Sequence, residues 1–88
     1  MDLLKEIRKS FPRIEKLFTE EGLSEFAQIH YARLENYNLG LGTMIRLKLL
    51  RPKSSIRRAF AQTGVTDTDK MAAKVVKEFH NYISQISR

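Results

Sequence analysis

The sequence predicts an all-α fold, a compact bundle of five or six helices around a central buried helix, in a single domain spanning residues 1–88. Three observations support this prediction. Apolar residues recur at helical spacing along almost the whole chain, and no alternating β-branched run exceeds a few residues. Proline and glycine, which interrupt helices, number only two and four. The content of 42% hydrophobic and 30% charged residues is ordinary for a folded single domain.

Three short helices are expected in the first part of the chain. The first stops at Pro12, and the second ends near Gly22, a natural C-terminal cap. Ser24 is the expected N-cap of the third helix. The apolar stripes of the three helices are, in order, Leu3, Leu4, Ile7 and Phe11; Ile14, Leu17 and Phe18; and Leu23, Phe26, Ala27, His30 and Leu34.

The segment 39–50 is expected to form the central helix. Its apolar residues point in nearly every direction around a helical wheel, with only two basic residues between them. A helix that is apolar all round is typically buried on all sides, so we expect this one, with Ile45, to be the most buried element. Gly40 and Gly42 would let a neighbouring backbone approach closely.

Two more helices are expected after Pro52. Ser54 or Ser55 caps the first of them, and Gly64 with an apolar residue after it closes that helix in the pattern of a Schellman motif. Thr66 is the expected N-cap of the last and longest helix. The inward residues are Ile56, Ala59 and Phe60 in the first helix, and Ala72, Val75, Val76, Phe79, Ile83 and Ile86 in the last.

The composition excludes several classes of protein. The chain has no cysteine, which excludes a disulfide framework and a thiolate zinc site. No stretch approaches the roughly 20 apolar residues that span a bilayer, so no membrane partner is expected. Charges at Asp2, Lys5 and Glu6 come too early for a signal peptide, so a cytoplasmic location is expected.

The positive charge is concentrated in the middle of the chain. The formal net charge is +6, and residues 37–66 hold six basic side chains and no acid. These six are Arg46, Lys48, Arg51, Lys53, Arg57 and Arg58. The helix dipole favours cations at a helix C-terminus, so the positions of Arg46 and Lys48 need no binding partner to explain them. Arg57 and Arg58, however, lie in the first turn of the next helix, where the dipole disfavours cations. The segment 46–58 is therefore the best candidate for binding an anionic partner.

Three blocks of the sequence resemble a known family. They are Leu-Gly-Leu-Gly-Thr-Met-Ile-Arg at 39–46, Ser-Ile through Phe to Gly-Val at 55–65, and Thr-Asp-Lys-Met-Ala through Phe at 68–79. The chain resembles a family of small bacterial helical proteins that is known only as a domain of unknown function, with an HFGLGxWIRN-type signature. Asn38 and Met44 stand where that family tends to have His and Trp. The resemblance implies a compact helical fold around a central buried helix, and it implies no catalytic residue.

Other motifs favour structural roles over chemistry. Gly40-x-Gly42 lacks the remaining residues of a P-loop or a dinucleotide fingerprint, so a role in helix packing is favoured. His30 on an apolar stripe and His80 on a surface helix have no cysteines or clustered carboxylates with them, so no metal site, cofactor or catalytic set is expected. Residues 54–80 have the length of a helix-turn-helix, but acids at the start of the second helix would repel phosphates.

The sequence therefore predicts a binding protein that is not an enzyme. Its basic segment is expected to engage an anionic partner, with nucleic acid or a ribonucleoprotein as the first candidate. The alternative is a protein–protein interaction module, such as a homodimer or a small phage-type inhibitor that docks on an acidic protein surface.

Overall fold

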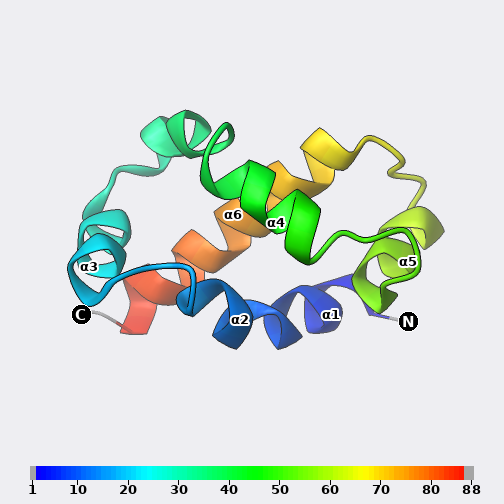
Figure 1. Cartoon of the computed structure of the whole chain (residues 1–88), viewed down its shortest axis with the longest axis horizontal. Helices are drawn as coiled ribbons and strands as arrows, with labels where there is room; N and C mark the ends of the chain where they lie inside the picture. Colours follow the sequence, from blue (N-terminus) through cyan, green and yellow to red (C-terminus); the bar gives the residue numbers. More distant parts are fainter. Residues whose placement is uncertain (1, 87–88) are drawn as a thin grey trace.

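The computed structural model describes residues 2–86 and confirms the all-α fold (Figure 1). These residues form six α-helices and one 3₁₀ helix, and none of them lies in a strand. The α-helices are α1 (Leu3–Lys9), α2 (Phe11–Glu15), α3 (Glu20–Gln28), α4 (Leu41–Lys48), α5 (Ser55–Gln62) and α6 (Thr68–Ile86), and the 3₁₀ helix is η1 (Tyr31–Tyr37).

Helix α6 is the central element of the fold. It has 19 residues, and Figure 1 shows it crossing the molecule behind α4. Helices α1, α3, α4 and η1 pack against it. The ring of Phe79 lies 5.5 Å from Phe11, 6.0 Å from Phe18 and 5.8 Å from Phe26, so one aromatic cluster joins α6 to α2, α3 and the loop between them. The predicted inner stripe is confirmed except for Ile86, which is exposed.

Helix α4 is buried on one side only, so the prediction that it is the most buried element is wrong. Ile45 is fully buried, as predicted, and Leu41 also faces the core. Leu39, Met44 and Leu47, however, are 89%, 38% and 65% exposed. A chain of 88 residues has too few helices to enclose two of them. The longer α6 takes the centre, and α4 lies across it with its other face outward (Figure 1).

The early helices begin and end at other residues than predicted. Thr19, not Ser24, caps α3, because its Oγ1 accepts a hydrogen bond from the Gly22 N–H at 3.0 Å. Gly22 therefore lies in the first turn of α3, after two glutamates that favour a helix N-terminus, and does not end α2. The extended backbone of Ile29 ends α3, so the predicted third stripe is divided between α3 and η1, and His30 caps η1.

The boundaries of α5 follow the prediction. The Ser54 hydroxyl caps the helix by accepting a hydrogen bond from a backbone N–H of the first turn at 3.2 Å. At the other end Gly64 has φ +85°, and the Val65 N–H donates to the Phe60 carbonyl at 3.2 Å. This is the Schellman motif that the glycine predicted.

Helix α6 is capped by Asp67 and not by the predicted Thr66. The Asp67 carboxylate accepts a hydrogen bond from the Asp69 N–H at 2.9 Å. Two carboxylates therefore stand at the start of α6, which is unsuited to the phosphate contacts of a DNA-reading helix.

The glycines of α4 do not require a close backbone approach. A Cβ on Gly42 would lie 3.8 Å from the Cβ of Ala72 on α6, an ordinary van der Waals distance. A Cβ on Gly40 would meet nothing within 4 Å. Only Gly42 faces the neighbouring helix, and even there a methyl group has room, which corrects the expectation for this pair.

Candidate functional site

The six predicted basic residues lie where expected, along the end of α4, the following loop and the first turn of α5. Three of them bond to the protein itself. Arg46 pairs with Asp69 on α6 at 2.7 Å. Arg57 donates to the Leu50 carbonyl and Arg58 to the Lys53 carbonyl, both at 3.1 Å. These contacts hold the 49–54 loop against α5, which gives the two first-turn arginines a structural role that the sequence did not indicate.

The other three basic residues, Lys48, Arg51 and Lys53, face solvent. Among residues 2–86, none of their side chains makes a hydrogen bond or an ion pair. No acid lies near them in sequence, because the stretch 37–66 contains none. The structure thus divides the basic segment into three arginines that make internal bonds and three cations available at the surface.

Arg13 on α2 is a further cation of this region that the sequence analysis missed. Its guanidinium donates to the Lys48 carbonyl at 3.3 Å. The last carbonyl groups of a helix have no hydrogen-bond donor within the helix. Arg13 donates to such a carbonyl at Lys48, and Arg57 donates to the carbonyl of Leu50 just after α4. The two bonded residues are 35 positions apart, and no local pattern around Arg13 marks it as a partner of the loop.

Glu6 on α1 borders the basic region. Its carboxylate accepts a hydrogen bond from the Ser55 hydroxyl at 2.9 Å and lies 3.4 Å from the Lys9 ammonium. The hydrogen bond from Ser55 lowers the pKa of the Glu6 carboxyl, and Lys9 adds to this effect, while partial desolvation opposes it. An acid from α1 therefore stands at the N-terminus of α5, where the helix dipole favours a negative charge. It helps explain why the first turn tolerates two arginines.

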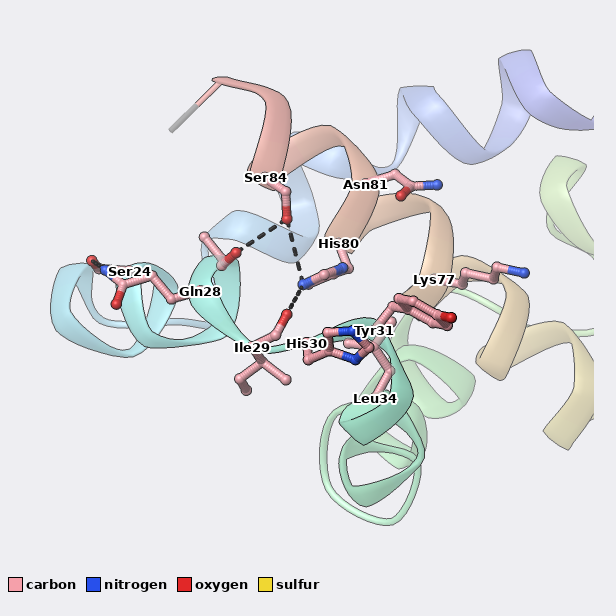
Figure 2. Close-up of a pocket in the computed structure, with 11 residues that line it drawn as sticks. Ser24, Gln28, Ile29, His30, Tyr31, Leu34, Lys77, His80, Asn81 and Ser84 are labelled. Carbon is pink, nitrogen blue, oxygen red and sulfur yellow. Dashed lines mark hydrogen bonds between the residues drawn. The ribbon is translucent and has the colours of Figure 1, made fainter. Parts of the chain in front are cut away.

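A shallow pocket of about 580 Å³ lies elsewhere, between α3, η1 and α6 (Figure 2). Figure 2 shows His80 and Ser84 at its inner end, with His30, Tyr31 and Lys77 along its side. The positions of the two histidines reverse the expectation, because His80 is buried and His30 is exposed.

His80 and Ser84 resemble a base and nucleophile pair in distance only. The His80 Nε2 lies 2.8 Å from the Ile29 carbonyl and 3.4 Å from the Ser84 hydroxyl oxygen. A carbonyl only accepts hydrogen bonds, so Nε2 carries the proton and cannot take one from serine. The Ser84 hydroxyl in turn donates to the Ala27 carbonyl at 3.1 Å. Both side chains tie the end of α3 to α6, so they hold the structure together.

Within residues 2–86, no group of three histidine or acidic side chains is arranged to hold a metal ion. No helix in that range combines the length and the apolar character needed to cross a bilayer.

Comparison with known proteins gives one result. The model of a family described as Domain of unknown function (DUF6794) matches residues 5–83. The chain belongs to this family. The resemblance to an uncharacterised domain family is therefore confirmed. No curated protein and no solved structure gives a match. Two of the blocks that carried the resemblance meet in space, since Arg46 from the first pairs with Asp69 from the third.

Proposed function

We propose that this DUF6794 protein is a non-enzymatic binding protein that engages an anionic macromolecule through its basic segment 46–58. The observation that carries the proposal is the group of three exposed cations, Lys48, Arg51 and Lys53, in a stretch that contains no acid. Like charges held near one another repel, and a polyanion relieves that repulsion as it binds.

The internal bonds of the segment support this assignment. Arg57 and Arg58 fasten the 49–54 loop to α5, and Arg13 fastens the end of α4 to α2. A loop held in one conformation presents its cations with little loss of conformational entropy on binding. In this arrangement the fastening arginines act as positioning residues, and the exposed cations make the contact with the partner.

Nucleic acid and an acidic protein surface are the two candidate partner classes. Single-stranded nucleic acid is usually bound by stacking bases on aromatic side chains, and the segment 46–58 contains no aromatic residue. Nucleic acid binding would therefore depend on phosphate contacts alone. With three such contacts, the log–log dependence of affinity on salt would have a slope of about −2 to −3.

Charge reversal with a matched control tests the proposal. The test variant is Lys48→Glu/Arg51→Glu/Lys53→Glu, and the control is Lys70→Glu/Lys74→Glu/Lys77→Glu, which changes three exposed lysines on α6. Both variants take the formal net charge of +6 to zero. Binding to mixed-sequence single-stranded RNA and to poly-glutamate is measured by fluorescence anisotropy at low salt. We expect the test variant to lose about tenfold or more in affinity, and the control to lose much less. Equal losses would mean that only net charge matters, and the basic segment would have no special role.

A further inference from the structure

The solvent-exposed face of α4 indicates which class of anionic partner binds. We infer that the anionic partner is a protein that presents an acidic amphipathic helix, which packs along α4 with its apolar residues on Leu39, Met44 and Leu47 and its carboxylates on Lys48 and Arg51. This inference rests on the proposed function of the basic segment. It adds the class of the partner and the place where it docks.

The apolar part of this surface is the first argument. Leu47 and Leu39 are 65% and 89% exposed, and Met44, one turn before Lys48, is partly exposed beside them. Single exposed leucines scattered over a surface are common on proteins and mark no site. Here Met44 and Leu47 are three residues apart and so lie on the same side of α4, and Leu39 lies in the turn just before the helix begins. An apolar row rimmed by polar groups is typical of a protein interaction site.

The position of the charges is the second argument. Lys48 directly follows Leu47 and lies one turn after Met44, and Arg51 is exposed in the loop just beyond the end of α4. The cations therefore stand at one end of the apolar row. A nucleic acid backbone would use the cations and leave the leucines uncovered. An amphipathic helix whose apolar face is flanked by Asp or Glu covers both.

The same arrangement disfavours a second copy of this chain as the occupant. The α4 face of another copy carries the same cations, and the stretch 37–66 offers no carboxylate to pair with them. Packing two such faces would bury the leucines but leave all the cations unpaired. Charge complementarity therefore favours a different, acidic protein.

The start of α4 has room for a helix to approach closely. A Cβ on Gly40 would meet nothing within 4 Å, so the backbone is open there. Small residues on a helix surface allow a second helix to pack at short distance. The partner helix thus meets no obstructing side chain at Gly40 and finds apolar contacts at Met44 and Leu47, before it reaches the cations.

An NMR titration of the isotope-labelled protein tests the inference. The probe is a synthetic helical peptide with leucines along one face and glutamates on both flanks. The comparison probes are a scrambled peptide of the same composition, a peptide with lysine in place of glutamate, and a mixed-sequence RNA. We expect the acidic amphipathic peptide to shift amide signals of residues 39–53, and the scrambled and basic peptides to shift them much less.

Two variants of the protein complete the test. Leu47→Ser should weaken binding of the acidic peptide about tenfold or more, because it removes the central apolar contact. Leu4→Ser changes a partly exposed leucine on α1 and should leave the affinity unchanged. Equal effects of the two variants, or equal binding of the scrambled peptide, would overturn the inference.

The remaining outcomes separate this inference from the proposed function. If the RNA shifts residues 46–58 and the peptide shifts nothing, the partner is a nucleic acid, and only the inferred class is wrong. If neither probe binds, both the inference and the proposed function fail. If the signals of α4 shift with protein concentration alone, the face is a contact between two copies, which also overturns the inference.

Discussion

A pair of alanine substitutions in α4 tests the finding that this helix is buried on one side only. Ile45 is completely buried, and Leu47, two residues later on the same helix, is 65% exposed. Removing a buried isoleucine side chain leaves a cavity, so Ile45→Ala should lower the free energy of unfolding by about 2–4 kcal/mol. Leu47→Ala removes side-chain atoms that are mostly in water already and places a better helix former there, so its effect should stay within about 0.5 kcal/mol.

The assay is thermal unfolding followed by circular dichroism at the helical minimum, with urea unfolding as a second measure. In a domain of this size each 1 kcal/mol shifts the Tm by about 4–8 °C, so Ile45→Ala should lower the Tm by roughly 10–30 °C. The Tm of Leu47→Ala should stay close to that of the wild type. Similar losses in the two variants would show that α4 is enclosed on both faces, and an unchanged Tm for Ile45→Ala would show that Ile45 is not part of the core.

Two further predictions concern the glycines and the change in stability at acidic pH. Gly42→Ala should raise the free energy of unfolding by about 0.5–1 kcal/mol, because a Cβ has room there and alanine is the better helix former. Gly64→Ala should lower the free energy of unfolding by about 1–2 kcal/mol, because the φ of +85° at this residue is left-handed. Urea unfolding measures both, and a loss of stability in Gly42→Ala would contradict the spacing of α4 and α6. The lowered pKa of Glu6 contributes stability that is present above its ordinary value of 4.5 and is lost as pH falls through the folded-state pKa. Ser55→Ala should therefore flatten the loss of stability on acidification below that value, and an unchanged slope would show that Ser55 does not stabilise the carboxylate.

The sequence predicted the fold class and the core of α6 well. The stripe from Ala72 to Ile83 follows helical spacing over several turns, and a pattern of that length is specific to an amphipathic helix. The Schellman motif at Gly64 was also predictable, because glycine with an apolar residue after it is a specific signal. His80 could have been placed in the core, since it lies one helical turn after the buried Val76 and one turn before the buried Ile83.

The environment of α4 could not be read from its own residues. An apolar helix is compatible with a fully enclosed position and with a position on the surface next to a partner. Only the arrangement of the other helices decides between the two, and in this chain α6 occupies the centre. Within the segment expected to be buried on all sides, Leu47 is 65% exposed, and Leu39 at its start is 89% exposed.

The candidate site was predictable in its position but not in its internal bonds. The acid-free stretch identified the basic segment directly from the sequence. The roles of Arg57 and Arg58 depend on the path of the 49–54 loop, which brings two backbone carbonyls within 3.1 Å of them. The contribution of Arg13 depends on how α2 packs against the end of α4, a contact between residues distant in sequence.

Site-specific photo-crosslinking in the cells that make the protein tests the central claim most directly. A photoreactive amino acid replaces Leu47 on the outward face of α4 or, as the control, Lys77 on the exposed side of α6. We predict a covalent adduct from position 47 and none from position 77, and mass spectrometry should identify the attached segment as a protein segment rich in aspartate and glutamate. Adducts from position 77 alone, or adducts from position 47 only to a second copy of this chain, would contradict the claim that this face receives an anionic partner.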